Sequence, residues 1–186
     1  MPLRIYGNRS LKTVSGQATR PTLAKVREAV FNIWQGEIEG CRWLDLCAGN
    51  GTMGAEALCR EAATVIGIEQ NGRACGVIRE NWQTVANPDQ TIQVIQGNVL
   101  KRLPLLAGQQ FDRIYFDPPY ASEVYEPTIQ AIARLRLLAP SGELAVEHAP
   151  QRQFPDEIGG EKGDRLTICR QKVYGGTALT FFVVAA

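Results

Sequence analysis

Short apolar runs alternate along this chain with longer segments in which apolar residues recur every three or four positions. Strands that alternate with helices are typical of βαβ units, which build a parallel sheet with helices on both faces. The strand-length runs are residues 42–47, 64–68, 91–96, 111–116 and 143–147. The segments with helical spacing are residues 52–60, 72–85, 100–106 and 124–138. We therefore predict an α/β fold with a mostly parallel sheet.

The N-terminal region lies outside this alternation. Residues 1–20 contain glycines, hydroxyl side chains and short apolar spots, which indicate a hairpin or a partly ordered arm. A helix follows, with Thr22 as its cap, and Gly36 closes it. We expect residues 1–40 to form a basic arm and a helix that pack on the core, and residues 41–186 to form the main globular unit.

The C-terminal region predicts a hairpin. Residues 165–174 and 178–184 are strand-like, and Gly175-Gly176-Thr177 joins them as a tight turn. We therefore expect the last strands to be antiparallel to a neighbour. The segment 151–164 in front of them is polar and contains proline and glycines, so we expect a loop that either contacts a substrate or simply connects two strands.

Composition limits the class of protein. The chain has 186 residues, 45% of them hydrophobic, which suits one domain with a single core. No apolar run approaches the ~20 residues of a membrane helix, and the first residues lack the apolar part of a signal peptide, so we expect a cytoplasmic protein. The five cysteines show no C-x-x-C spacing and His148 is the single histidine, so we expect reduced thiols and no bound metal.

The charges are distributed unevenly. Residues 1–27 hold six basic side chains and no acidic one, whereas the rest of the chain holds 14 basic and 19 acidic side chains. An ordinary solvated surface is one interpretation. We favour contact with a polyanion such as nucleic acid, because the basic groups are concentrated in one arm. The residues predicted to contact it are Arg4, Arg9, Lys12, Arg20 and Thr22.

A glycine-rich loop follows the first strand of the alternating region. Gly49, Gly51 and Gly54 satisfy the pattern G-x-G-x-x-G, which allows a tight turn and lets a ligand approach the backbone at the start of a helix. Glu69 ends the second strand, twenty residues after Gly49, where an acid can bind a ribose diol. The loop therefore predicts a nucleotide-like cofactor.

Two classes of cofactor use this geometry, the dinucleotides and S-adenosylmethionine. Asp45 lies in the strand just before the glycines, where it would repel a pyrophosphate but could hold the ammonium group of S-adenosylmethionine. Asn98 follows the third strand and could accept a hydrogen bond from the adenine amino group, or could simply form a turn. We therefore favour S-adenosylmethionine.

The segment Asp117-Pro118-Pro119-Tyr120 follows the strand-like run 111–116. Each proline fixes its own φ near about −65° and lacks a backbone N–H, so the turn is stiff and offers carbonyl acceptors. These acceptors and the ring of Tyr120 suit a flat group that bears an amino group. We expect Asp117 and the Pro118 carbonyl to accept the amino hydrogens while Tyr120 stacks on the flat face. Since an ordinary Asp titrates near ~4, we expect Asp117 to be a poor base.

These motifs occur in the order and spacing seen in amino-methyltransferases that use S-adenosylmethionine. Nearly end to end, the chain resembles the bacterial 16S ribosomal RNA guanine-N2 methyltransferase family. Residues 20–32 look like its N-terminal signature, 44–51 like its glycine loop and 174–179 like its C-terminal hairpin. Relatives usually carry Phe, Ser and Asp at the positions of Cys47, Asn50 and Asn98.

The resemblance implies a Rossmann-like class I methyltransferase domain over residues 41–186, with seven strands of which the last is reversed. It implies methyl transfer from S-adenosylmethionine to the exocyclic N2 amine of one guanine in small-subunit rRNA, by a monomer that acts on an assembling ribosomal particle. The predicted catalytic residues are Asp117, Pro118, Pro119 and Tyr120. The predicted cofactor-binding residues are Asp45, Ala48, Gly49, Asn50, Gly51, Glu69, Gln70, Asn98, Val99 and Asp117.

Other activities fit parts of the same pattern. A DNA adenine-N6 methyltransferase uses similar chemistry, but this chain has little room for the extra surface that reads a DNA sequence. A nicotinamide-dependent reductase would share the glycine loop, but Asp45 and the Pro-Pro turn fit it poorly. A silent RNA-binding module would not need the intact segment 117–120. His148 follows a predicted strand near the pocket, and we favour a structural role for it over a catalytic one.

Overall fold

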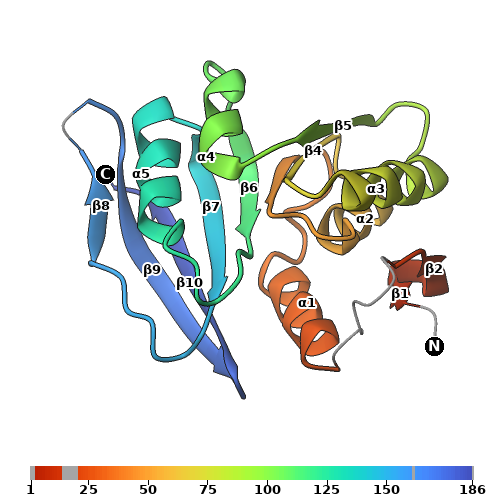
Figure 1. Cartoon of the computed structure of the whole chain (residues 1–186), viewed down its shortest axis with the longest axis horizontal. Coiled ribbons are helices and arrows are strands. Elements are labelled where there is room, and N and C mark those ends of the chain that lie inside the picture. The colour runs from red at the N-terminus through yellow and green to blue at the C-terminus, as the bar shows by residue number, and fades with distance from the viewer. Residues whose placement is uncertain (1–2, 14–20, 161, 186) are drawn as a thin grey trace.

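One large sheet forms the centre of the protein in a computed structural model, which describes residues 3–13, 21–160 and 162–185 (Figure 1). Its strands are β3 (Arg42–Leu46), β4 (Thr64–Glu69), β5 (Thr91–Gln96), β6 (Phe111–Phe116), β7 (Leu138–His148), β8 (Glu157–Gly159), β9 (Arg165–Tyr174) and β10 (Thr177–Val184). They lie side by side in the order β5-β4-β3-β6-β7-β10-β9-β8.

The strand order reverses between β3 and β6. From β3 the chain proceeds outward through β4 to β5, and it then returns to place β6 on the other side of β3. The neighbours from β5 to β7 are parallel, whereas β10 is antiparallel to both β7 and β9. In open α/β sheets a ligand crevice forms at such a reversal, outside the carboxyl ends of the two central strands.

The side chains of alternate strand residues point to opposite faces of the sheet and pack into two cores, one on each face. The helices are α1 (Pro21–Ile33), α2 (Thr52–Cys59), α3 (Gly72–Val85), α4 (Val99–Arg102) with the 3-10 turn η2 (Leu103–Leu106), and α5 (Tyr125–Leu135). On β3, Leu44 packs in a cluster with residues of α4 and α5. The adjacent Trp43 points the other way and stacks on Phe31 of α1, with ring centroids 5.3 Å apart. The helices α1, α2 and α3 therefore cover the face opposite α4 and α5. Among the described helices, none has both the length and the apolar character needed to cross a lipid bilayer.

The N-terminal arm is a small antiparallel hairpin beside α2 and α3 (Figure 1). It consists of β1 (Leu3–Ile5), the 3-10 turn η1 (Tyr6–Asn8) and β2 (Arg9–Leu11). Ile5 and Leu11 are buried in the same core as α1. Arg27 of α1 donates to the carbonyl of Arg4 at 2.8 Å and pairs with Glu56 of α2 at 3.3 Å. The arm is thereby held against the body by both apolar and charged contacts.

The structure corrects three expectations about the sheet and its helices. The sheet has eight strands rather than seven, because the short β8 forms within the polar segment 151–164 and pairs with β9. α5 ends at Leu135, where Arg136 takes a left-handed conformation (φ 54°) without the glycine that usually marks such an end. β7 begins at residue 138 instead of 143, and an irregularity in its pairing with β6 accommodates Pro140 and Gly142.

Candidate active site

The two motifs singled out in the sequence meet at the reversal of the strand order. The glycine loop follows β3 and the segment 117–120 follows β6, and these strands pair in parallel up to Leu46 and Phe116. The backbone N–H of Asp117 donates to the carbonyl of Leu46 at 3.2 Å. The motifs are 70 residues apart in sequence and lie next to each other only because β6 is inserted beside β3.

The glycine loop turns sharply through backbone conformations that favour glycine. Gly49 and Gly51 have φ values of 60° and 74°, and Cys47 also lies in the left-handed region at 61°. The N–H of Gly51 closes the turn on the carbonyl of Ala48 at 2.7 Å. Ala48, Gly49 and Asn50 are half-buried residues, so this part of the loop is open to a ligand.

The third glycine of the loop serves packing. A Cβ atom placed on Gly54 would lie 2.3 Å from the buried ring of Trp82. The indole N–H of Trp82 also donates to the carbonyl of Gly51 at 2.7 Å. Gly54 therefore allows α3 to approach the loop closely, and Trp82 fixes the shape of the loop from beneath.

Asp45 occupies the anion position at the start of α2. Its carboxyl group is 2% exposed and accepts the N–H of Gly54 at 3.1 Å. Burial raises the pKa of Asp45 to about 7, the Gly54 hydrogen bond opposes the rise, and the nearby Glu69 adds to it. A pyrophosphate would have to displace this carboxylate from the helix N-terminus, so the arrangement disfavours a dinucleotide and suits a cationic group.

Glu69 ties the glycine loop to β4. One carboxylate oxygen accepts the N–H of Gly49 at 2.9 Å and the other accepts the N–H of Asn71 at 2.7 Å. Each oxygen keeps a second lone pair, so the carboxylate can still receive two ligand hydroxyls. Gln70, which lies between Glu69 and Asn71 in the sequence, is exposed.

Asn98 caps α4 with its side chain. Its amide oxygen accepts the N–H groups of Leu100 at 3.1 Å and Lys101 at 3.4 Å. This oxygen is the atom that we expected to accept from adenine, and it already serves the helix. The first N–H of α4, on the buried Val99, has no acceptor within the helix and lies at the carboxyl end of β5.

The segment 117–120 is held in place by polar contacts around it. The carbonyl of Pro118, which we expected to face the amine, is buried and accepts the hydroxyl of Tyr125 at 3.2 Å. The carbonyl of Pro119 accepts the N–H of Ser122 at 2.8 Å. Arg152 donates to the carbonyls of Tyr120 and Ser122 at 3.2 and 3.1 Å, and its guanidinium lies 4.1 Å from the centre of the Tyr125 ring.

Three polar side chains meet beneath Tyr120. Its hydroxyl donates to Glu147 at 3.1 Å and lies 2.7 Å from the hydroxyl of Thr177. Glu147 also accepts the hydroxyl of Tyr115. Glu147 and Thr177 are buried, whereas the Tyr120 side chain is 37% exposed, so its hydroxyl end is anchored and part of its ring is open.

The acid–base character of Asp117 differs from our expectation of a poor base. Burial raises its pKa well above the ordinary range, and the charges of Glu147 and Asp45 raise it further. Within the described part of the chain, none of the four crevice carboxyl groups, on Asp45, Glu69, Asp117 and Glu147, forms an ion pair. A cation bound here would lower the raised pKa values of Asp45, Asp117 and Glu147 by its charge.

Three of the residues predicted to bind RNA lie on the described part of the arm. Arg4, Arg9 and Lys12 are exposed on the arm, Arg20 lies outside the described residues, and the side chain of Thr22 is likewise not described. Arg9 donates to the sulfur of Cys59 and to the carbonyl of Val85, at 3.3 and 3.2 Å. Lys12 forms an exposed ion pair with Glu80 at 2.6 Å. Residues 3–13 contain these three basic side chains and no acidic one.

Asn81 of α3 joins the arm to the glycine loop. Its amide oxygen accepts the N–H of Lys12 at 2.9 Å, and its amide nitrogen donates to the carbonyls of Lys12 and Asn50 at 2.9 and 3.0 Å. Sequence reasoning missed this residue, because an asparagine inside a helix carries no local signal for partners 69 and 31 residues away. Asn81 therefore places Lys12 of the arm next to the glycine loop.

His148 is buried and both of its ring nitrogens have hydrogen-bond partners. It is 2% exposed, its Nδ1 donates to the carbonyl of Ala149 at 2.9 Å, and its Nε2 accepts the hydroxyl of Thr180 at 2.8 Å. Burial lowers its pKa, which keeps the ring neutral. Among the described residues, no three His, Cys, Asp or Glu side chains come together as metal ligands would.

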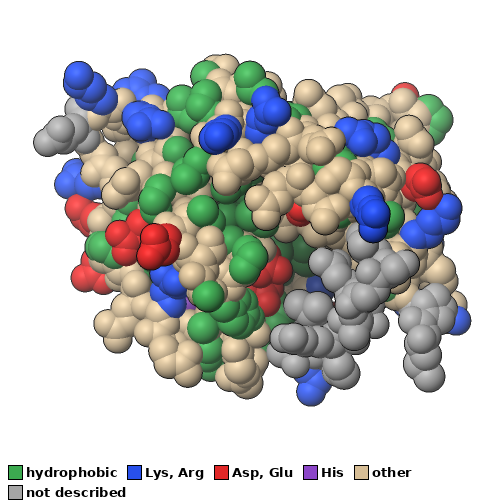
Figure 2. Space-filling view, in the orientation of Figure 1, with side chains coloured by type: hydrophobic (Ala, Val, Ile, Leu, Met, Phe, Trp, Pro, Cys, Tyr) green, Lys and Arg blue, Asp and Glu red, His purple; other side chains and the backbone are tan. Residues whose placement is uncertain are grey.

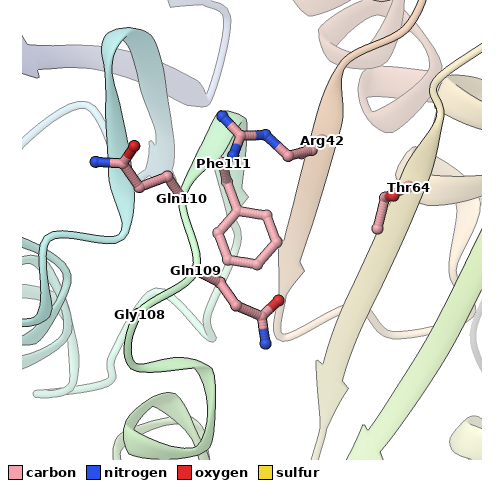
Figure 3. Close-up of a pocket in the computed structure, with 6 residues that line it drawn as sticks. All are labelled: Arg42, Thr64, Gly108, Gln109, Gln110 and Phe111. Atoms are coloured by element: carbon pink, nitrogen blue, oxygen red, sulfur yellow. The ribbon is translucent and has the colours of Figure 1, made fainter.

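Acidic and basic side chains both lie on the face shown in Figure 2. Several Asp and Glu side chains gather at its left, beside Lys and Arg side chains, and further Lys and Arg side chains lie along its upper edge. A pocket of about 310 Å³ lies at the other end of the sheet, at the amino ends of β3, β4 and β6 (Figure 3). The residues that line this pocket belong to neither the glycine loop nor the segment 117–120, and one of them, Arg42, pairs with Asp112 at 3.0 Å.

Comparisons with known proteins cover almost the whole chain. A family model described as "Conserved hypothetical protein 95" matches residues 3–183. YlbH of Bacillus subtilis (strain 168), whose name assigns it provisionally to the rRNA methyltransferases, is 31% identical over 94% of this chain and 92% of its own. Ribosomal RNA small subunit methyltransferase D of Escherichia coli (strain K12) is 29% identical over 97% and 89% of the two chains. The solved structure of Escherichia coli yhhF, named provisionally as a methyltransferase, has a TM-score of 0.82, 27% identity and coverage of 100% and 99%.

Proposed function

Because the chain belongs to the family described as conserved hypothetical protein 95, we propose that it is an S-adenosylmethionine-dependent methyltransferase of small-subunit rRNA. Its target is the exocyclic N2 amine of a guanine. The prediction of a class I methyltransferase fold is confirmed, with one strand more than expected. The observation that carries the proposal is the meeting of the glycine loop and the segment 117–120 beside four carboxyl groups at the reversal of the strand order.

The crevice fits the cofactor on three counts. The unpaired carboxyl groups suit a ligand with a sulfonium and an ammonium group. Glu69 has two lone pairs left for a ribose diol. The first N–H of α4, on Val99, is available to an adenine ring nitrogen, and Asn98 supports it by capping the helix. We assign the ammonium to Asp45 and the half-buried loop backbone at Ala48, Gly49 and Asn50.

Bound S-adenosylmethionine supplies a methyl group that is already activated by its positive sulfur. The residues of this chain therefore have to orient the amine and stabilise the charge that develops on its nitrogen. Asp117 accepts one amino hydrogen, and the Pro118 carbonyl can use its second lone pair for the other. Tyr120 stacks on the base. Orientation of this kind can be worth ~7–11 kcal/mol of the barrier.

The proton that the amine loses has an acceptor in Asp117. Burial raises the pKa of Asp117 and the nearby carboxylates raise it further, so its affinity for a proton exceeds that of an ordinary Asp. Asp117 must be ionised before it can accept, and a cation in the crevice favours that state. A paired base cannot reach the segment 117–120, so the target guanine is unpaired or flipped out of its helix.

The proposal extends to the substrate particle, the oligomeric state and the location of the enzyme. We propose that the protein acts as a cytoplasmic monomer on a partly assembled small-subunit particle, with the basic arm on rRNA phosphates. The basic surface of the arm and its position next to the glycine loop support this assignment. A duplex DNA substrate is the alternative that the assay has to separate.

The test is transfer of labelled methyl groups from S-adenosylmethionine. The acceptors are naked 16S rRNA, small-subunit particles from a strain that lacks this gene, and duplex DNA, followed by mapping of the modified base. We expect N2-methylguanine in the particle RNA and none in DNA. Labelling of DNA adenine, or no labelling of either RNA substrate, would overturn the proposal.

The first prediction concerns Asp117 in this assay. Asp117→Ala should lower kcat by about 10²–10³, because a fixed acceptor aimed at the developing charge is lost. Binding of S-adenosylhomocysteine, measured by calorimetry, should change little, since the loop and Glu69 remain. A variant with near-normal turnover would show that Asp117 has no catalytic role.

A further inference from the structure

Glu147 and Thr177 belong to neither the glycine loop nor the segment 117–120. They lie on β7 and β10, and they meet at the hydroxyl of Tyr120, which is 27 residues before one and 57 before the other. Glu147 is 2% exposed and Thr177 is 4% exposed. Two buried polar groups at one tyrosine hydroxyl need an explanation, since each loses its hydration on folding.

The directions of these hydrogen bonds follow from the donors available. A phenol has one proton, and Tyr120 donates it to Glu147 at 3.1 Å. Thr177 must then donate its own proton to the Tyr120 oxygen across 2.7 Å. Glu147 receives a second proton donor, the hydroxyl of Tyr115. The chain of donors therefore runs from Thr177 through Tyr120 to the Glu147 carboxylate.

The side-chain hydrogen bonds of Tyr120 are those of its hydroxyl, to Glu147 and Thr177. The residue is 37% exposed, so part of the ring lies outside the packed core. Two hydrogen bonds from different strands restrict both the position of the hydroxyl and the direction from which the ring leaves it. Arg152 holds the backbone of the same residue through the carbonyl at 3.2 Å.

We propose that Glu147 and Thr177 are positioning residues, which hold the hydroxyl of Tyr120 and so fix the plane against which the target base stacks. The proposal rests on the proposed function of Tyr120. It assigns to the C-terminal hairpin a part in the reaction, because Thr177 is the first residue of β10. The carboxylate of Glu147 has a second effect, since it lies near Asp117.

The first experiment is a double-mutant cycle with Tyr120→Phe and Thr177→Val. Thr177→Val, which removes one hydrogen bond, should lower kcat about three- to tenfold, and Tyr120→Phe, which removes two, should lower kcat at least as much. KM for the RNA should change less than twofold in both, because the ring remains. The double variant should be no slower than Tyr120→Phe alone, since Thr177 acts through a hydroxyl that is already absent. Effects that multiply, or a Thr177→Val enzyme with unchanged kcat, would overturn the proposal.

Thr180→Val is the matched control. Thr180 is a buried threonine of the same strand, and its hydroxyl bonds to His148 and Gln171 at 2.8 and 3.3 Å instead of Tyr120. It should lower the melting temperature about as much as Thr177→Val and leave kcat unchanged. If both variants lower the melting temperature and neither changes kcat, Thr177 has a structural role only and the proposal fails.

A pH profile separates the two positioning residues. The groups that face Asp117 are Asp45 on β3, Tyr115 on β6, Tyr120, Tyr125 on α5, Glu147 on β7 and the thiol of Cys47. Glu147→Gln removes one negative charge from this set, so the acid limb of kcat against pH should move to lower pH by about one unit. Thr177→Val should leave the limb in place. If the acid limb of the pH profile stays in place in Glu147→Gln, the charge of Glu147 does not raise the pKa of Asp117 and this part of the proposal fails.

A readout without RNA distinguishes failure of this proposal from failure of the proposed function. In crystals of Thr177→Val the Tyr120 ring should occupy a new position or several positions. A single, unchanged ring position would show that Thr177 does not fix the ring and would overturn the proposal. A wild-type protein that methylates no rRNA would refute the proposed function and leave this measurement as the test of the hold.

Discussion

Asp45 carries a charge that the fold has to bury. Its pKa is raised to about 7 from an ordinary value near 4, so in the folded protein the proton leaves only at neutral pH. Because the pKa of Asp45 is higher in the folded than in the unfolded protein, its contribution to stability is fully present below pH ~4 and is lost as the pH rises through 7. Above that pH the buried charge destabilises the protein by roughly 4 kcal/mol.

The second prediction is therefore that Asp45→Asn becomes more stable relative to the wild type as the pH rises. The amide oxygen can still accept the Gly54 N–H, while the ionised form is removed. Urea unfolding at pH 5 and pH 8 measures the difference, which should be larger at pH 8 by up to a few kcal/mol. An equal difference at the two pH values would show that Asp45 does not titrate as described.

The same substitution should weaken binding of S-adenosylhomocysteine, which retains the ammonium group. Asp45 thus destabilises the empty protein at neutral pH but attracts the ligand. Such a trade-off between stability and binding is expected at a functional site. Asp117 follows the same pattern, since burial and two neighbouring carboxyl groups raise its pKa.

At the scale of elements, the contact of α3 with the glycine loop decides the shape of the cofactor site. Trp82 fills the space above Gly54 and donates to the carbonyl of Gly51. The third prediction is that Gly54→Ala destabilises the protein by about 1–3 kcal/mol, because the added methyl overlaps a fully buried ring.

Gly76 provides the control, since it lies in the middle of α3 with no atom within 4 Å of an added Cβ. Gly76→Ala should be neutral or stabilising by up to about 1 kcal/mol, because alanine favours the helix. Urea unfolding measures both variants. If the two have the same effect, the packing of Trp82 does not restrict position 54.

Asn81 couples a second pair of elements, the arm and the glycine loop. The fourth prediction is that Asn81→Leu weakens binding of S-adenosylhomocysteine and also loosens the arm, because three hydrogen bonds to Lys12 and Asn50 are lost. We expect a destabilisation of about 1–3 kcal/mol from the unsatisfied backbone groups. Calorimetry and proteolysis of the arm provide the two measurements.

The matched control for Asn81 is Glu80→Gln, one residue away on the same helix. It removes the exposed ion pair with Lys12, which should be worth less than about 1 kcal/mol. An Asn81→Leu protein that binds the ligand as Glu80→Gln does would contradict the coupling.

Local pattern predicted the elements where apolar spacing and turn residues agree. The bounds of α3, β5, β6 and β9 are those expected from the sequence. β8 escaped prediction because only one apolar residue, Ile158, stands in its polar surroundings. The site was predicted as far as it lies in contiguous motifs. Glu147, Thr177 and Asn81 were missed because their partners are 27 to 69 residues away and depend on strand order.

At the scale of the whole molecule, opposite charges have separate tasks. Carboxyl groups gather beside the glycine loop, where we propose that they attract a cationic cofactor, while the arm carries exposed basic groups. If the two signs were mixed at one site, each would weaken the attraction exerted by the other. The near-neutral total of +1 therefore conceals a molecule with a basic arm and an acidic crevice.

The fifth prediction concerns the arm. RNA binding should weaken steeply with added salt, and Arg4→Gln combined with Lys12→Gln should reduce the slope of log K against log salt by about 1.5, through two lost phosphate contacts. Fluorescence anisotropy from 50 to 300 mM salt would measure it. Arg136→Gln with Arg165→Gln, two exposed arginines at the far side of the sheet, should leave the slope unchanged. If the affinity of the wild-type protein for RNA does not change with salt concentration, the arm does not contact phosphates.

The position of β10 has a consequence for how the protein is made. β10 follows every other strand in the sequence, yet it lies inside the sheet, between β7 and β9. While the ribosome is still translating, the nascent chain therefore exposes two strand edges that only residues 177–184 can join. The sheet cannot close, and Thr177 cannot reach Tyr120, until these residues have left the exit tunnel. A pause in translation near this point would prolong an open intermediate that is prone to aggregation.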